Sequence, residues 1–346
     1  MTNPPPTLHG RPIDEVARRT GILAQVARID RLVEDDGPAR GARRIRLVTG
    51  GGLEVEIHPD RALDLGQVTY RGTPIAWMSP TGMVAPAIAE CTGDSWLRSF
   101  GGGLLATCGL DTYGPATTDA GVQFPLHGRV GTVPALVTRS SISGTELVVS
   151  GLVRQASVFG ENLVLERTWS ADLGGTSLRL TDVVRNEGLE DSGHMVLYHV
   201  NIGWPLLDES AVLDIPSLEV TAKDGAASAD PVGWQTIEAP QHGYRERVYS
   251  HRFVGQGTVR VAIDNAELDV RFELGFDSST LPALHQWKMS GEGHYVMGLE
   301  PVNVSTFGGR AGARAAGILP VLPRGGEVSY TMEFGFGPSQ LTRSRA

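Results

Sequence analysis

Three short motifs in this chain carry side chains that can move protons. They are Leu126-His127-Gly128, Tyr198-His199-Val200-Asn201-Ile202-Gly203 and Gly298-Leu299-Glu300-Pro301. The proton affinity of histidine and glutamate can be tuned by their surroundings to operate near neutral pH. If the three motifs meet in one cleft, they form a candidate acid/base site that acts on a neutral substrate.

The elements that must position these motifs are predicted to be β-strands. Leu53, Val55 and Ile57 alternate with polar residues, and residues 328–336 show the same period of two, which is typical of a strand with one buried face. Further strands are expected over residues 45–48, 147–149, 163–169, 178–184, 195–202, 259–263, 268–274 and 295–299. Glycine is abundant, with 44 residues, and 13–33 is the best of few helix candidates. The pattern favours an all-β fold, a large antiparallel β-sandwich with few short helices.

Composition limits the function classes. The chain has 346 residues, 41% of them hydrophobic, which is enough for a large core, and we expect a single domain over 1–346. A net charge of −9 without a basic cluster argues against nucleic acid as a partner. Residues 1–6 lack the basic and apolar regions of a signal peptide, and no apolar run is long enough to span a membrane. A cytoplasmic protein is therefore expected, and a homodimer is compatible with the sequence.

The predicted strands suggest how the three motifs are presented. His199 falls inside the strand 195–202, where it shares one face with Asn201. Glu300 is expected to end the strand 295–299, since Pro301 interrupts regular pairing. A glutamate there is costly to bury without partners, so it is either exposed or functional. His127 lies in a loop context. For both histidines a purely structural role, as a satisfied core residue or a turn residue, is the competing interpretation.

Other polar residues are candidates for substrate contact. Arg61 stands in a turn with Asp64, where a local ion pair explains it equally well. Gln286 and Lys288 flank Trp287 and offer an amide and a cation to a ligand rich in hydroxyl groups, although ordinary strand residues look the same. The nine histidines show no metal-binding spacing, so no metal site is predicted. Neither a phosphate loop nor a hydrolase nucleophile elbow is present.

The order of these motifs resembles a known superfamily. Leu-His-Gly, then His-x-Asn-x-Gly, then Gly-Leu-Glu-Pro resembles the aldose 1-epimerase, or galactose mutarotase-like, superfamily. The stretches 61–66, 107–110 and 319–327 bring the chain closest to the bacterial branch of that superfamily that is named as a domain of unknown function. The resemblance covers residues 41–336, taken as the core of the domain, and it implies a β-supersandwich of the galactose mutarotase type.

The resemblance also implies roles for the candidate residues. Glu300 would take the proton from the anomeric hydroxyl and His199 would protonate the ring oxygen, with no cofactor. His127 would bind and polarise the sugar, and Asn201, Arg61, Gln286 and Lys288 would be further substrate contacts. Anomer exchange on a free or modified sugar is the function expected. Two alternatives stay open, a carbohydrate-binding protein without activity and a metal-dependent sugar isomerase or epimerase in which His127, His199 and Glu300 are ligands.

Overall fold

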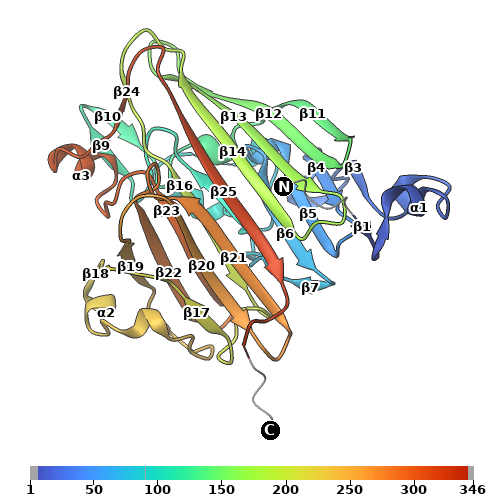
Figure 1. Ribbon diagram of the computed structural model, residues 1–346. Coiled ribbons are helices and arrows are strands. Elements are labelled where there is room, and N and C mark those ends of the chain that lie inside the picture. Colours follow the sequence, from blue (N-terminus) through green and yellow to red (C-terminus); the bar gives the residue numbers. More distant parts are fainter. Residues whose placement is uncertain (1–6, 90, 342–346) are drawn as a thin grey trace.

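Two large antiparallel sheets stack face to face in this protein (Figure 1). The computed structural model describes residues 7–89 and 91–341. The expected antiparallel β-sandwich is confirmed, and so is the scarcity of helix. Within the described residues the α-helices are short: α1 (Ile13–Ala17), α2 (Gly225–Ser228) and α3 (Gly309–Ala315). Residues 1–6, on which the expectation of no signal peptide depends, lie outside the described residues.

The first sheet has eight strands, and each strand pairs antiparallel with its neighbours in the sheet. In spatial order the strands are β11 (Leu136–Ser143), β12 (Glu146–Ala156), β13 (Asn162–Asp172), β14 (Ser177–Asn186), β25 (Glu327–Gly337), β21 (Val270–Asp277), β20 (Thr258–Asn265) and β17 (Val212–Asp214). The strand nearest the C-terminus, β25, therefore lies in the middle of the sheet between β14 and β21, as Figure 1 shows.

The second sheet has eleven strands and carries the His199 and Glu300 motifs, while Leu126-His127-Gly128 lies in a loop before β11. In spatial order they are β18 (Glu219–Ala222), β19 (Arg247–Arg252), β22 (Ala283–Gly291), β23 (His294–Val302), β16 (Leu197–Gly203), β8 (Leu105–Cys108), β6 (Asp64–Tyr70), β5 (Leu53–His58), β4 (Arg43–Val48) and β3 (Arg28–Val33), with β7 (Thr73–Pro74) beside β6. Three two-stranded ribbons complete the structure: β1 (Thr7–Leu8) with β2 (Arg11–Pro12), β9 (Thr117–Asp119) with β10 (Val122–Phe124), and β15 (Ser192–Gly193) with β24 (Val321–Leu322).

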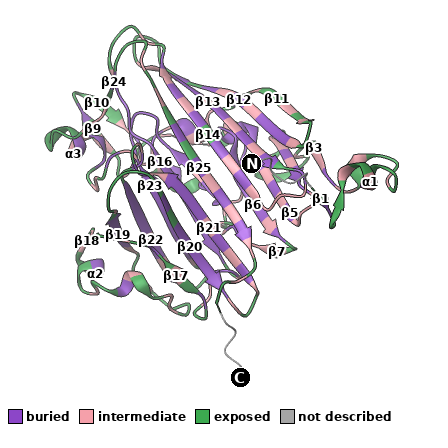
Figure 2. Cartoon of the chain, in the orientation of Figure 1, coloured by how far each residue is buried: buried purple, intermediate pink, exposed green. Residues whose placement is uncertain are grey.

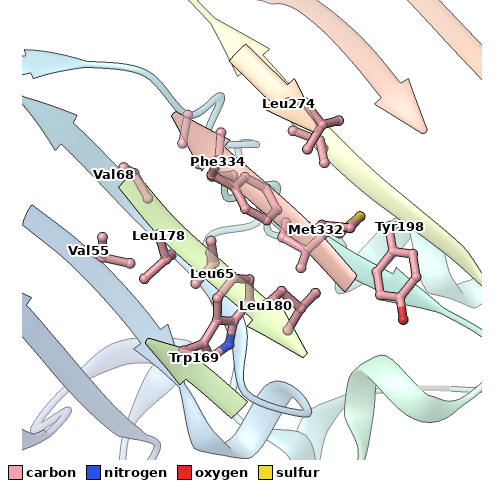
Figure 3. Packing of buried hydrophobic residues seen from close by; sticks show 14 of the residues in the cluster. Val55, Leu65, Val68, Trp169, Leu178, Leu180, Tyr198, Leu274, Met332 and Phe334 are labelled. Atoms are coloured by element: carbon pink, nitrogen blue, oxygen red, sulfur yellow. The ribbon is translucent and has the colours of Figure 1, made fainter. Parts of the chain in front are cut away.

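The main hydrophobic core fills the space between the two sheets. Val55, Leu65 and Val68 of the eleven-stranded sheet face Trp169 and Phe334 of the eight-stranded sheet (Figure 3). All of these side chains are fully shielded from solvent. Burial of this apolar surface is the main force that holds the sheets together.

The burial pattern along the strands shows which sheet carries a second packed face. Strands β12, β13 and β14 alternate between buried and partly exposed residues, as the period of two predicts (Figure 2). Strand β16 is buried at every position. One of its faces packs in the main core, and the other lies beneath the loops that carry Trp96 and His127. The site is therefore built on the outer face of the eleven-stranded sheet, opposite the core.

The prediction that the strand ends at Glu300 is wrong. Strand β23 continues through Glu300 and Pro301 to Val302. Pro301 is tolerated because β23 keeps its pairing with β22 at this point, while the ladder toward β16 is interrupted between the pairs Leu197 with Val302 and Val200 with Leu299. Among the described residues, no helix is long and apolar enough to cross a membrane.

Candidate active site

Three titratable side chains form a row across adjacent strands. His285 on β22 is the direct cross-strand partner of Glu300 on β23. The register of β23 with β16 puts His199 opposite Glu300 on its other side, because Leu197 pairs with Val302 and Val200 with Leu299. Directly opposed residues on one face of a sheet have Cβ atoms ~5 Å apart. The topology alone therefore brings two histidines to the two flanks of one glutamate.

The contact between Glu300 and His199 is the closest in this row. Glu300 Oε1 lies 3.2 Å from His199 Nε2, and both side chains are almost completely shielded from solvent. Gly298 lies two residues before Glu300 on the same face and leaves the space that the carboxyl group occupies. A Cβ atom at position 298 would lie 2.6 Å from Glu300 Oε1 and 3.3 Å from His199 Cε1. The glycine of the Gly-Leu-Glu-Pro motif is thus required by the position of the carboxyl group.

Aromatic side chains wall the space above this row. Trp96, from a single-turn 3₁₀ helix over Ser95–Arg98, stacks on Phe100 with ring centroids 4.1 Å apart. On the other side the ring of Trp287 meets the ring of His199 edge to face at 5.4 Å. The enclosed cleft has a volume of about 270 Å³. Its lining comprises Trp96, Leu97, Phe100, Tyr113, Gly114, Pro115, Leu126, His127, Leu197, His199, Lys223, Glu246, Val248, His285, Trp287, Glu300, Thr306 and Phe307.

His127 closes the cleft from the loop side. Its backbone has a φ of 59°, and its ring lies 4.5 Å from the ring of Trp96 and 5.9 Å from that of His199. Backbone hydrogen bonds hold the turn: the N–H of His127 donates to Gly114 O at 2.9 Å, and the N–H of Gly109 donates to His127 O at 3.1 Å. Gly128 follows with a φ of 77°, and a Cβ there would lie 2.4 Å from Gly109 O. The Leu-His-Gly motif is therefore a tight turn that aims the imidazole at the row.

Burial in this cleft sets the protonation of the pair. It lowers the pKa of His199 to about 4, although an interaction with the Asn201 side chain acts in the opposite direction. Burial raises the pKa of Glu300 to about 8, against the effect of the Lys223 ammonium. Desolvation disfavours the charged form of each group. Between pH 4 and pH 8 the pair consequently holds one proton, which is the stoichiometry of an acid beside a base.

The comparison with protein families identifies the chain. A family model described as "Domain of unknown function (DUF4432)" matches residues 39–336. The chain belongs to this family. The branch expected from the sequence motifs is thereby confirmed. No curated protein matches this DUF4432 chain.

Several solved structures have a fold similar to that of the DUF4432 chain. A provisional aldose 1-epimerase from Klebsiella pneumoniae has a TM-score of 0.82 at 24% identity, over 90% of this chain and 83% of that one. A galactose mutarotase-like protein from Clostridium acetobutylicum has a TM-score of 0.65 at 14% identity, over 91% and 99% of the chains. Galactose 1-epimerase from Lactobacillus acidophilus has a TM-score of 0.63 at 13% identity, over 91% and 100%. The expected galactose mutarotase-like supersandwich is confirmed.

Four of the substrate contacts expected from sequence, Gln286, Lys288, Asn201 and Arg61, lie outside the cleft lining. Gln286 and Lys288 point to the opposite face of β22 from His285 and Trp287, and both are buried. The Gln286 amide meets His251 Nε2 at 3.1 Å and donates to Trp234 O at 2.9 Å. Lys288 pairs with Glu238 at 2.7 Å. Gln286 and Lys288 therefore make contacts that stabilise the fold. His285 and Trp287 line the cleft in their place.

Asn201 lies on the His199 face but below the cleft lining. It is fully buried, and its amide donates to Gly103 O and to His199 O, each at 3.0 Å. Its effect on the site therefore passes through His199, whose pKa it raises.

Arg61 and the neighbouring Asp64 have structural roles in the DUF4432 chain. The Arg61 guanidinium donates to Ser99 O at 2.8 Å, beneath Trp96 and Phe100, and lines a small separate cavity. The expected local pair with Asp64 is replaced, since Asp64 accepts from Arg167 at 2.6 Å and from the Thr107 hydroxyl at 2.6 Å. Arg61 consequently supports the segment that forms one aromatic wall.

The sequence reasoning missed three polar residues at the cleft. Burial lowers the pKa of His285 to about 3, so this imidazole is neutral, and it lies in the lining of the cleft. Lys223 directly follows β18, and Glu246 accepts from the Trp287 indole at 2.9 Å. Only the strand register, which puts His285 opposite Glu300, identifies the first of these.

The possible metal ligands of the site have the wrong arrangement for a metal ion. In the part of the chain that the structure describes, no three His, Cys, Asp or Glu side chains are grouped as ligands. His127, His199 and Glu300 approach one another, but the imidazole of His127 meets that of His199 through ring contacts at 5.9 Å between centroids. Such a ring contact differs from the convergence of nitrogen and oxygen atoms at ~2 Å from one point that a metal requires.

Proposed function

We propose that this protein is an aldose 1-epimerase-type isomerase that exchanges the anomers of a small free or modified sugar. The observation that carries the proposal is the Glu300–His199 pair, 3.2 Å apart and buried at the floor of an aromatic cleft. Burial shifts the two pKa values to opposite sides of neutrality, so that one proton is held between two groups. An anomer exchange needs an acid and a base at the two oxygens of one carbon.

The proposed reaction begins when the single proton of the pair passes from Glu300, where burial favours it, to Nε2 of the adjacent His199, which leaves a carboxylate on Glu300. Glu300 removes the proton from the anomeric hydroxyl, the bond between the anomeric carbon and the ring oxygen breaks as the aldehyde forms, and His199 protonates the ring oxygen. The pair then has a neutral imidazole and a protonated carboxyl group, the form that burial favours. After rotation of the aldehyde, the same transfers run in reverse and close the ring to the other anomer. No proton is gained or lost from solvent in the cycle.

The remaining cleft residues are proposed to hold the sugar. Trp96, Phe100 and Trp287 offer faces and edges to the apolar C–H groups of a sugar ring. The neutral imidazoles of His127 and His285 supply hydrogen bonds to hydroxyl groups, since burial lowers the pKa of both. His127 is assigned to substrate binding next to the reacting oxygens.

Replacement of Glu300 tests this function. We expect Glu300→Gln to slow anomer exchange by about 10²–10⁴-fold, because an amide cannot accept the hydroxyl proton. Exchange is measured by two-dimensional NMR exchange spectroscopy over a panel of aldoses, ketoses and sugar acids, which reports isomerisation in the same spectra. Glu333→Gln on β25, in the exposed pair with Arg260, is the matched control and should exchange sugars like the parent protein.

Three outcomes would contradict the proposal. Exchange that is unchanged in Glu300→Gln would remove Glu300 as the base. Sugar binding by saturation-transfer NMR without exchange of any sugar in the panel would make the protein a carbohydrate-binding protein. Activity that is lost on chelation and restored by one divalent ion would favour the metal-dependent isomerase.

A further inference from the structure

A second cavity adjoins the cleft on the outer face of the same sheet. It has a volume of about 410 Å³ and is lined by Trp77, Ser79, Pro80, Thr81, Leu97, Phe100, Glu246, Trp287, Met289 and His294. Four of these residues, Leu97, Phe100, Glu246 and Trp287, also line the Glu300 cleft. The two spaces therefore share one boundary, and a ligand that passes it touches both.

The inner cleft has room for only a small ligand. Its volume of about 270 Å³ lies below the ~300–1,000 Å³ of pockets that hold drug-sized molecules. The row of His285, Glu300 and His199 occupies its floor, which fixes where the reacting end of a ligand must lie. The shared boundary gives any further part of that ligand a route into the outer cavity.

The outer cavity has the side chains of a sugar-binding surface. The rings of Trp77 and Trp287 meet at 78° with centroids 6.3 Å apart, and Phe100 lies 5.8 Å from Trp77. A continuous aromatic track thus runs from Trp96 through Phe100 to Trp77. Glu246 stands at the boundary, fixed by the Trp287 indole at 2.9 Å, and His294 adds an exposed imidazole at the rim. Aromatic faces with a few hydrogen-bonding groups at the edge suit the C–H face and hydroxyl groups of a pyranose.

The aromatic wall between the two cavities is supported from behind. The hydroxyl of Thr81 donates to Phe100 O at 2.9 Å and that of Ser79 donates to the same oxygen at 2.5 Å. The backbone N–H of Trp77 donates to Asn201 O at 3.1 Å, which ties this wall to the His199 strand. The outer surface is therefore held in register with the reacting pair, as a binding site requires.

We propose that the outer cavity is a second sugar subsite and that the substrate is a reducing oligosaccharide of at least two rings. Its reducing-end ring lies in the inner cleft with the free anomeric hydroxyl at Glu300, and the next ring lies on Trp77 and Trp287. The proposal rests on the proposed function for the identity of the inner ring. It adds no chemical step, since only the reducing-end anomer changes.

A comparison of sugars with one common reducing end tests the subsite. D-Glucose, cellobiose, maltose and lactose all present glucose to the inner cleft and differ only beyond it. For at least one disaccharide we expect kcat/KM of anomer exchange to exceed that of glucose by about tenfold, the value of one good aromatic contact. Trp77→Ala should abolish this preference and leave glucose exchange unchanged. Trp204→Ala, an exposed tryptophan that lines neither cavity, is the matched control.

A second variant tests the outer cavity without removing Trp77, and so without the local damage that the loss of this large side chain can cause. Met289 lies two residues beyond Trp287 on the same face of β22 and lines only the outer cavity of the two. Met289→Trp should fill that space, raise KM for the disaccharide by about tenfold or more and spare glucose. A disaccharide preference that survives both variants would overturn the subsite.

A binding measurement separates this proposal from the proposed function. In Glu300→Gln, saturation-transfer NMR should detect contacts to the outer-ring protons of the preferred disaccharide, and Trp77→Ala should remove them. That result supports the subsite even if no sugar is exchanged by the parent protein. Catalysed glucose exchange without disaccharide preference and without outer-ring contacts would refute the subsite and leave the proposed function standing.

Discussion

At the scale of single residues, the site depends on two groups that burial pushes in opposite directions. The pKa of His199 falls to about 4 and that of Glu300 rises to about 8. Because the two groups are in contact, these values describe the pair, which is doubly protonated below pH 4 and fully deprotonated above pH 8. Only the form with one proton contains both an acid and a base.

We therefore expect a bell-shaped pH dependence of kcat/KM for anomer exchange, with limbs near pH 4 and pH 8. Activity is lost as the pH falls through the lower limb because the pair gains a second proton and no base remains. It is lost as the pH rises through the upper limb because the carboxyl proton leaves and no acid remains. Rates from NMR exchange over pH 3.5–9.5 check this, and a rate that keeps rising above pH 9 would be incompatible with it.

Gly298 provides a second test at this scale, because its substitution displaces chiefly the carboxyl group of Glu300, with Trp287 Cβ at 3.1 Å and His199 Cε1 at 3.3 Å as the next contacts. A Cβ there would lie 2.6 Å from Glu300 Oε1, while the φ of Gly298 is outside the left-handed region. Gly298→Ala should lower kcat by about 10²-fold, since a shift of ~1 Å in a reacting group has an effect of that size.

Gly335→Ala on β25 is the matched control, because a Cβ there makes only ordinary contacts of 3.8 Å. Both variants should keep their midpoint of urea unfolding close to that of the parent. Equal kcat values in the two variants would show that the space above position 298 is unimportant.

At the scale of elements, the strand β22 shows what the sequence could and could not predict. The sequence points to Gln286 and Lys288 as substrate contacts, but β22 is not among the strands that it predicts. Nor does the sequence show which of its two faces meets the cleft, because each face carries side chains that can hydrogen-bond, His285 and Trp287 on one and Gln286 and Lys288 on the other. The cross-strand pair of His285 with Glu300 decides the question, and pairing register is a property of the sheet.

Paired substitutions on β22 test this assignment of faces. His285→Phe keeps a ring in the cleft but removes both nitrogens, so KM should rise by about tenfold for the loss of a hydrogen bond to the sugar. Gln286→Leu should leave kcat/KM within about threefold but lower the free energy of unfolding by ~1–3 kcal/mol, because His251 and Trp234 O lose their partner. Exchange kinetics and urea unfolding on both variants measure this. The reverse pattern would restore Gln286 as the substrate contact.

The motif on β16 and the turn at residues 126–128, which lies between β10 and β11, were more predictable. His199 stands inside a strand, as expected, and the tight turn at Leu126-His127-Gly128 follows from a histidine and a glycine with positive φ. The contact of His199 with Glu300 needs two strands that are separated by nearly a hundred residues to lie side by side. Short-range patterns carry no information about that pairing, and only the shared order of the motifs suggested it.

At the scale of the whole molecule, a buried charge network joins the two sheets. Arg167 on β13 of the eight-stranded sheet pairs with Asp182 on β14 at 2.7 Å and reaches Asp64 on β6 of the eleven-stranded sheet at 2.6 Å. The hydroxyl of Tyr198 on β16 donates to Asp182 at 2.8 Å. The Tyr198 strand also carries His199, so the network and the site share an element. No sequence pattern predicts such a network, because its members come from four strands.

Loss of the central cation should therefore destabilise the whole sandwich. Arg167 is fully buried, and Arg167→Met would leave the carboxyl groups of Asp64 and Asp182 buried without a cation. Breaking a buried pair in this way costs ~3–5 kcal/mol of the free energy of unfolding. The control is Arg179→Met on β14, whose partners Glu146 and Asp172 are largely exposed, so that its cost should stay within ~1 kcal/mol. Urea unfolding followed by tryptophan fluorescence measures both, and equal losses in the two variants would mean that the network does not hold the sheets together.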